Sequence, residues 1–466
     1  MEKDKVQKTG QSFLAGAVII SAGGFISKLL GALYRIPLSN FLGGEGMGIY
    51  QMVYPLYCIL LTVSASGIPT GISRLISSGS GAGAERQAFR LYGVVGVIGT
   101  LIMFILSAPL ASVQGEPAIT ACCQLLCPSV FFVSLLSVVR GYFQGKGNML
   151  PTAVTEILEQ LIKVGFGVLF SYLFRGNLPV AVASTLLAVT ISEVVSTAIA
   201  LLWYFRRRTK PPLYKTQSVP VKSILRFTVP LTLTAIALPL SQLAESIVAV
   251  RILRAASENA TALYGVFSGC AVTIINLPVS ITYGLAASSV PQISPLAEKG
   301  DISGAKKKAF KSLLITLAVS VPLAIAVYFT APLTTRLIFG SLEGSEKELL
   351  INLIKIMAVS SVTGSLVQTS SACLTALGYP VRSTITQWTT AILRVGVTAA
   401  LLYFTPLSIS GAAWAANCAY LVAMIMNFCY IISVGKSNRK GEGNEDNADR
   451  IGSFKGRLNA QSEGGA

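Results

Sequence analysis

The chain has 466 residues, of which 52% are hydrophobic and only 12% are charged, against about 25% charged residues in an average soluble domain. This composition excludes an ordinary water-soluble protein, because so few polar residues could not cover its surface. The net charge of +17 lies mostly in short segments between apolar stretches and lacks interleaved aromatic residues, which argues against nucleic-acid binding.

Apolar stretches that are long enough to cross a bilayer follow one another along the chain, and they predict an all-α polytopic membrane protein with about twelve transmembrane helices. The first stretch is longer than the apolar core of a signal peptide, so we interpret it as a span and not as a cleaved leader. The predicted spans are 11–37, 46–77, 88–113, 118–143, 151–174, 179–205, 223–252, 262–293, 307–333, 347–377, 382–404 and 408–434.

Basic residues alternate along the segments between these spans. The segment between the fourth and fifth spans contains Arg140 and Lys146, whereas 40–46, 112–118 and 406–410 contain no basic residue. Basic segments stay on the cytoplasmic side, so the pattern predicts a bacterial plasma-membrane protein with both termini in the cytoplasm.

The two halves of the chain resemble each other, since 147–165 aligns without gaps on 378–396. Both halves begin on the same side, which indicates a parallel repeat about an axis along the membrane normal. The predicted parts are a six-helix lobe (1–205), a basic cytoplasmic linker (206–222), a second six-helix lobe (223–434) and a disordered cytoplasmic tail (435–466). Folds of this kind usually bind substrate between the lobes and rock to alternate access.

Basic residues inside predicted spans are candidates for binding a substrate, because a charge within the bilayer is costly. Lys28 and Arg35 share one helical stripe with Gly24 and Gly31, which leaves room beside each cation and suits a cavity that receives an anion. In the alternative interpretation, these two side chains reach out to a membrane interface.

The fifth span has a second charged stripe, formed by Glu156, Glu159 and Lys163, in which Glu159 and Lys163 can pair. The corresponding residues of the second half are Gln387, Thr390 and Arg394. The cation is retained there without either carboxylate, so Arg394 must find a partner on another helix or face a cavity. Lys28, Arg35, Lys163 and Arg394 are therefore the candidates for binding phosphate-like charge, although structural ion pairs are an equal alternative for the last two.

Buried acids are candidates for ion coupling. Glu193 and Glu245, together with Glu156 and Glu159, could carry a proton or Na⁺, or could form structural pairs, for example with Arg251. The chain has no histidine, and its eight cysteines all lie in apolar segments, so neither a metal site nor another cofactor is predicted. Coupling to Na⁺, to H⁺ or to the membrane potential stays open.

Several motifs resemble a known family, the stage V sporulation protein B group. This group belongs to the polysaccharide-flippase branch of the MOP superfamily, which also contains the MurJ-type lipid II flippases and the MATE exporters. The motifs are Ser27-Lys28-Leu29-Leu30-Gly31 with Leu42-Gly43, Gly67-Ile68-Pro69, Arg140-Gly141-Tyr142-Phe143-Gln144-Gly145, and Pro151-Thr152-Ala153 with Glu159-Gln160.

The resemblance implies a V-shaped pair of six-helix lobes that flips a polyprenyl-diphosphate-linked oligosaccharide to the outer leaflet. In MurJ-type proteins, cations in the first span bind the diphosphate, and Ser27-Lys28 occupies that place here. The chain departs from the MurJ type because it lacks a base between Tyr264 and Pro291 and lacks two further C-terminal spans.

An alternative function is a MATE-like exporter of small organic cations, which would share the fold. The excess of bases over acids among the cavity candidates argues against it. A membrane enzyme is disfavoured because histidine and long outer loops are absent, so we predict a transporter whose partners are the bilayer and a lipid-linked oligosaccharide. The sequence gives no indication of oligomeric state.

Overall fold

The computed structural model describes residues 2–65, 67–77, 84–207, 229, 232–342 and 344–435; within these, the side chains of 2–18, 20, 21, 28, 70, 74, 75, 77, 84 and 85 are not described. The described part is helical, without a strand, so the prediction of an all-α membrane fold is confirmed. The helices are α1 (Glu2–Ala65), α2 (Ile68–Ser77), α3 (Ala84–Gln114), α4 (Ala118–Leu126), α5 (Pro128–Gly145), α6 (Leu150–Leu173), α7 (Leu178–Arg207), α9 (Ala237–Arg254), α10 (Ala260–Tyr264), the π-helix η1 (Gly265–Ala271), α11 (Val272–Glu298), α12 (Ile302–Ile338), α13 (Gly344–Ala376), α14 (Pro380–Phe404) and α15 (Ser410–Ser433).

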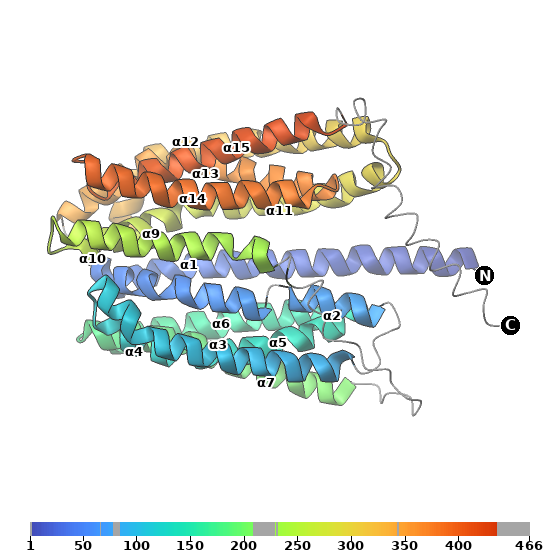
Figure 1. The fold of residues 1–466 in the computed structure, drawn as a ribbon, viewed down its shortest axis with the longest axis horizontal. Helices are drawn as coiled ribbons and strands as arrows, with labels where there is room; N and C mark the ends of the chain where they lie inside the picture. Colours follow the sequence, from blue (N-terminus) through green and yellow to red (C-terminus); the bar gives the residue numbers. More distant parts are fainter. Residues whose placement is uncertain are drawn as a thin grey trace.

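The helices run roughly along one long axis and form two groups (Figure 1). Helices α1 to α7 lie in one group, called here the N-terminal half, and α9 to α15 lie in the other, the C-terminal half. We call the two ends of the molecule the α10 end and the α2 end. Most of the predicted linker 206–222 and of the predicted tail 435–466 lies outside the described residues, and the predicted lobe boundaries remain predictions.

Helix α1 contains the first predicted span and part of the second, and the expected loop at 40–46 is helical except at one residue. Gly43 has φ 65° and ψ −171°, a combination that glycine adopts easily because it has no Cβ. The chain turns back at this point, so α1 is two antiparallel spans joined by a single residue (Figure 1).

The predicted span 46–77 is wrong as a single helix. It breaks after Ala65, and α2 begins at Ile68. Pro69 favours a helix start here, because a proline fits the first turn of a helix, where its missing amide hydrogen needs no acceptor within the helix. The amide of Gly71 donates a hydrogen bond to the carbonyl of Gly67 over 3.0 Å and closes the first turn of α2.

Within the described residues, 10 helices are long and apolar enough to cross a membrane. This number falls below the expected twelve because α1 counts once and because α6 carries Glu156, Glu159 and Lys163. The chain is therefore a multi-pass membrane protein, and its helix α6 carries these three charged residues.

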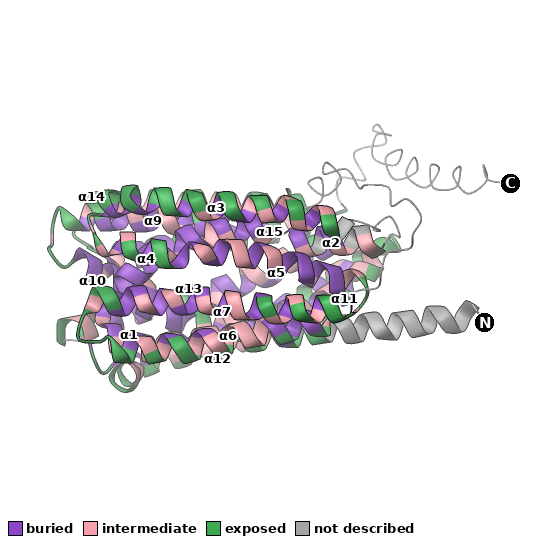
Figure 2. Ribbon diagram, turned by 90° about the horizontal axis from the view of Figure 1, so that it is seen from below, coloured by how far each residue is buried: buried purple, intermediate pink, exposed green. Residues whose placement is uncertain are grey.

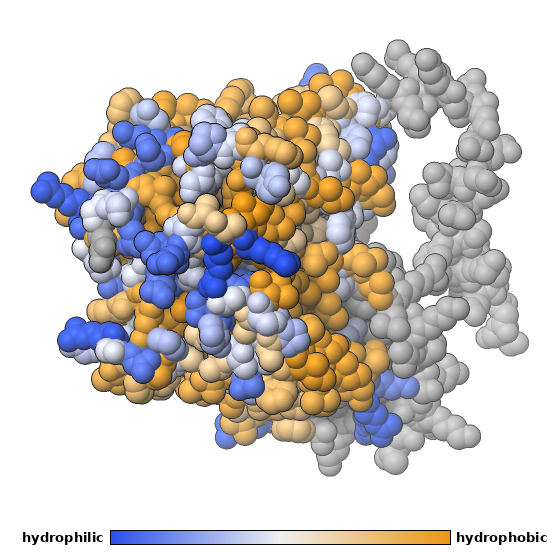
Figure 3. Space-filling model, turned by 60° about the vertical axis from the view of Figure 1, so that its left-hand side comes forward, coloured by the Kyte–Doolittle hydropathy of each residue, from blue (hydrophilic) through white to orange (hydrophobic). Residues whose placement is uncertain are grey.

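The buried residues lie between the helices and the exposed residues lie on the outer faces of the bundle (Figure 2). Helices α3 and α12 expose large hydrophobic side chains, including Leu101, Ile105, Leu314 and Phe329, which would contact lipid tails. Figure 3 brings the α10 end forward and shows hydrophilic residues near the middle of that face, flanked by hydrophobic surface.

Candidate functional site

A buried ion pair lies inside the C-terminal half. The Nη2 of Arg394 on α14 lies 2.7 Å from Oε2 of Glu245 on α9, and its Nε donates to Oε1 over 3.0 Å. Thr398 donates a further hydrogen bond to Oε1 over 3.2 Å, and the Glu245 side chain is 2% exposed. Arg394 thus has a partner on another helix and contacts both oxygens of Glu245, and it also lines a cavity, so both open alternatives for Arg394 are observed.

A second ion pair in the N-terminal half corrects two expectations. Arg140 lies within α5, not in a loop, and its Nη2 is 3.2 Å from Oε2 of Glu159 on α6. Its Nε also donates to the hydroxyl of Thr155 over 3.0 Å. The expected pairing of Glu159 with Lys163 is therefore replaced by a pairing across two helices, which a partner from α5 makes possible.

Glu193 on α7 lies next to this pair. Its side chain is buried, with 1% exposure, and its carboxyl neighbours that of Glu159. The hydroxyl of Tyr57 donates to Oε1 of Glu193 over 3.3 Å, while Oε2 has no hydrogen-bond partner. Two carboxyl groups thus lie together, and one of them has an unused oxygen.

Two cations of the N-terminal half make no ion pair with any described residue. Lys163 on α6 is buried and close enough to Glu159, Glu193 and Arg35 to feel their charges, yet none of them lies within ion-pair distance. Arg35 makes one long hydrogen bond of 3.4 Å, from Nη1 to the hydroxyl of Thr273 on α11 in the other half. Neither cation is therefore neutralised by an ion pair within the described part of the chain.

The stripe of α1 that contains these predicted residues faces α6. A Cβ at Gly24 would lie 4.0 Å from Oε2 of Glu156 and one at Gly31 would lie 3.3 Å from Oε1 of Gln160, so the glycines let side chains of α6 approach α1 closely. The side chain of Lys28, the remaining predicted cation of this stripe, lies outside the described residues.

Polar atoms without partners accumulate in the same place. Ser27 Oγ, Tyr34 Oη and Gln160 Oε1 are buried at the contact between α1 and α6, and none has a hydrogen-bond partner among the described residues. Buried polar groups are normally paired, so these atoms lie where a bound ligand or water would satisfy them.

The two halves repeat this helix pair. Contacts between α1 and α6 have counterparts between the segment 234–245 and α14, where the α6 and α14 residues are related by the same shift of 231 positions as 147–165 and 378–396. The pairs are Gly23 with Ala153, Gly31 with Gln160 and Tyr34 with Gly167 in the first half, and Thr234 with Thr384, Ser241 with Ala391 and Glu245 with Thr398 in the second.

This correspondence places Glu245 where the N-terminal half has Tyr34. Lys163 corresponds to Arg394 in the repeat, but among the described residues no carboxylate lies within ion-pair distance of it. The two halves therefore differ at this position, since Glu245 neutralises Arg394 whereas Lys163 has no ion-pair partner among the described residues.

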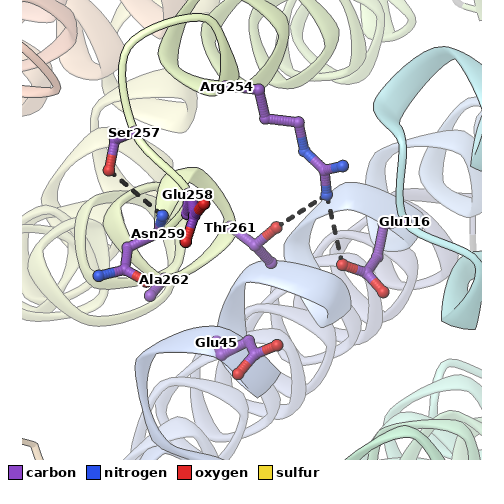
Figure 4. A pocket seen from close by; sticks show the side chains of 8 residues that line it. All are labelled: Glu45, Glu116, Arg254, Ser257, Glu258, Asn259, Thr261 and Ala262. Carbon is purple, nitrogen blue, oxygen red and sulfur yellow. Dashed lines mark hydrogen bonds and ion pairs between the residues drawn. The ribbon is translucent and has the colours of Figure 1, made fainter.

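The halves touch at the α10 end, where Arg254 at the end of α9 reaches across to the N-terminal half (Figure 4). Its Nη2 lies 3.4 Å from Oε2 of Glu116, and its Nη1 donates to the carbonyl of Gly115. Arg254 and Glu116 line a water-accessible cavity of about 390 Å³, together with Glu45 and Glu258. This contact connects the halves through polar groups that are partly exposed.

Backbone contacts also join the two halves near the α10 end, and we call this interface the seam. Gly265, in η1, lies directly against the backbone of Gly44 and Gly48, and Gln51 donates to the carbonyl of Ser268 over 3.0 Å. A π-helix is rare and often marks a functional site. The seam is therefore built from glycines, and a side chain at these positions would separate the halves.

Sequence reasoning missed the role of Arg140, Tyr57 and Arg254. Arg140 could have been found, because it opens the Arg-Gly-Tyr-Phe-Gln-Gly motif and its position next to a predicted helix end allowed a buried partner. Tyr57 and Arg254 act through contacts with distant segments that no local pattern encodes.

The chain matches the family model described as "Polysaccharide biosynthesis protein" over residues 13–297. Relatives in Bacillus subtilis (strain 168) include stage V sporulation protein B, which is 28% identical over 71% of this chain and 67% of the relative. The lipid II flippase MurJ is 22% identical over 90% of this chain and 82% of the relative. The resemblance predicted from the motifs is confirmed.

Solved structures share the fold. An inward-facing MATE-family multidrug resistance transporter of the MOP superfamily superposes with a TM-score of 0.74 at 18% identity, covering 90% of this chain and 99% of that one. A MOP superfamily transporter from Pyrococcus furiosus, described as having a binding pocket of reversed polarity, superposes with a TM-score of 0.66 at 17% identity, covering 90% of this chain and 96% of that one. The fold is therefore that of MATE-like transporters.

Proposed function

Because this chain belongs to the polysaccharide biosynthesis protein family, we propose that it is a flippase for a polyprenyl-diphosphate-linked oligosaccharide, such as a cell-wall precursor. In this proposal the lipid-linked sugar enters between the halves on the cytoplasmic side and leaves toward the outer leaflet. The family is one of transporters, and the named relatives include a lipid II flippase.

The observation that carries the proposal is the pair of cations without carboxylate partners in the N-terminal half. Lys163 and Arg35 offer positive charge, and the unpartnered hydroxyls of Ser27 and Tyr34 lie on the same helix pair. A diphosphate needs both positive charge and hydrogen-bond donors, which hydroxyl groups supply. Lys28 lies on the same stripe of α1 and is proposed as a further phosphate ligand.

Orientation follows from the charges of the sequence. If the termini are cytoplasmic, the α2 end faces the cytoplasm and the seam of Arg254 and Glu116 faces outward. The described arrangement is then the one that is closed to the outside and ready to accept substrate from inside. Alternation would require the seam at the α10 end to open.

The test is a reconstitution experiment. Purified protein is placed in liposomes with a fluorescent polyprenyl-diphosphate disaccharide, and the appearance of the label in the opposite leaflet is measured with a membrane-impermeant quencher. We expect transfer faster than in protein-free liposomes. Transfer at the protein-free rate, with and without ion gradients, would contradict the proposal; efflux of a cationic dye by the same preparation would point to a drug exporter.

A further inference from the structure

The C-terminal half encloses a cavity of about 500 Å³ that the proposed phosphate site does not use. Helices α9, α11, α13, α14 and α15 each contribute residues to its wall. This volume lies within the range of small-molecule sites, roughly 300–1,000 Å³. The cavity is large enough to hold a ligand of about the size of a sugar residue or two.

The wall of this cavity carries no net charge. Arg394 is its one charged lining residue, and both oxygens of Glu245 neutralise that guanidinium. In the repeat, Gln387 and Thr390 of this wall correspond to Glu156 and Glu159 of the other half. Neutral residues thus replace both carboxylates, so neither a phosphate nor an organic cation would find a charged partner here.

The polar groups of the wall include three amide side chains. Oε1 of Gln368 is buried and has no partner within the described residues, while Gln387 is half-buried and Asn276 is exposed. An amide side chain both donates and accepts, which matches hydroxyl and acetamido groups. Leaving such groups unpaired is costly, so a ligand that pairs them is favoured.

The remaining wall is apolar and includes one aromatic residue. Ile275, Val279 and Val367 line the cavity together with Tyr420. Pyranose rings have C–H faces that pack on such surfaces, while their substituents bind amides. A wholly apolar ligand, such as a lipid tail, would leave the amides unpaired.

We propose that this C-terminal cavity is a binding site for an uncharged acetamido sugar. The inference builds on the proposed function, because it assigns the sugar part of a lipid-linked substrate to the C-terminal half and the diphosphate to the N-terminal half. The two sites then bind different chemical parts of one substrate molecule.

The test measures sugar binding by purified full-length protein without any transport. Diacetylchitobiose, a soluble acetamido disaccharide, is titrated while the thermal unfolding midpoint is recorded, with maltose as a sugar that lacks the acetamido group. We expect saturable stabilisation by diacetylchitobiose. Gln387→Leu and Gln368→Leu should each weaken binding by about three- to tenfold, which corresponds to one or two lost hydrogen bonds.

Gln292→Leu is the matched control, because Gln292 is an exposed glutamine of α11 whose amide bonds only its own helix. Elution profiles and unfolding midpoints without sugar show whether each variant folds. Absence of saturable binding by the wild type, or wild-type affinity in both cavity variants, would overturn the sugar site.

Flipping assays separate this inference from the proposed function. If the wild type flips the lipid-linked disaccharide but binds no sugar in the cavity, the sugar site fails and the flippase stands. If the protein binds diacetylchitobiose through Gln387 but transfers no lipid, the site stands and the proposed function fails.

Discussion

Glu245 neutralises Arg394 inside the C-terminal half, whereas the equivalent position of the N-terminal half is Tyr34, which leaves Lys163 without a carboxylate partner of this kind. The helix pair α9 and α14 thus contains a stabilising ion pair, whereas the equivalent pair α1 and α6 contains a cation that we propose binds an anion. This difference leads to separate expectations for the two cations.

Removing the carboxylate of Glu245 should destabilise the protein strongly. Glu245→Gln leaves the Arg394 charge buried and uncompensated, which costs about 3–5 kcal/mol for a broken buried pair. We expect a lower thermal unfolding midpoint in detergent. The double variant Glu245→Gln/Arg394→Gln should recover part of this loss, because no charge remains buried. A double variant as unstable as the sum of the single ones would show that the pair is not coupled.

Substituting Lys163 should impair transport more than stability. In Lys163→Met, loss of a charge-assisted contact to phosphate should lower the apparent affinity for the lipid-linked substrate about ten- to hundredfold. The liposome assay at several substrate densities measures this change. Lys355→Met is the control, because Lys355 lies half-buried beside the ring of Tyr328, 5.8 Å from its centroid. Equal losses in both variants would remove Lys163 from the site.

The carboxyl pair of the N-terminal half should carry a coupling proton, if protons drive transport. Glu193 is surrounded by Tyr57 from α1, Glu159 and Lys163 from α6, and Arg140 from α5. Two neighbouring carboxyl groups readily share one proton. Flipping by the wild type should then change when a pH gradient is imposed.

Glu193→Gln mimics the protonated state and should remove this response while leaving flipping without a gradient measurable. Glu258→Gln, an exposed carboxyl at the α10 end, should keep the response of the wild type. A response to the gradient that survives in Glu193→Gln would assign coupling to another group or to the membrane potential.

The contact between Arg254 and Glu116 should have to open in each transport cycle. An ion pair that is partly exposed contributes only about 0.2–1 kcal/mol, so Glu116→Gln should change the flipping rate by less than about fivefold. A covalent link should do much more. Cysteines at 116 and 254, joined by a short bifunctional maleimide, should stop flipping.

This cross-linking needs a background without reactive thiols, and Cys418 and Cys429 are the exposed cysteines of the described part, to be replaced by serine. Each single-cysteine variant treated with the same reagent serves as the control. Undiminished flipping by fully cross-linked protein would show that the halves do not separate at this end.

Composition and the lengths of the apolar stretches were enough to predict an all-α membrane fold. A chain that spans lipid must pair its backbone groups internally, and helices do this within each segment. The segments around Gly43 and Pro69 were predicted less well. A turn made by one glycine is too short to interrupt an apolar pattern, and Pro69 could bend a helix or begin one.

The candidate charges were found because ionisable residues are conspicuous in apolar spans, but their partners were not. Glu159 and Lys163 are close in sequence, yet Arg140 pairs with Glu159 across a helix interface. The partner of Arg394 lies 149 positions away. Such pairings depend on which helices become neighbours, which is a property of the packed bundle and not of any local window.

The glycine seam at the α10 end gives the molecule a mechanical weak point that can be used experimentally. Backbones that meet without interdigitating side chains can pivot with little repacking, and one added methyl acts as a wedge between them. Alanine at Gly48 or Gly265 would press on opposing backbone and not on flexible side-chain ends. A single carbon atom could thus tilt the population toward the separated state and make that state accessible to structure determination.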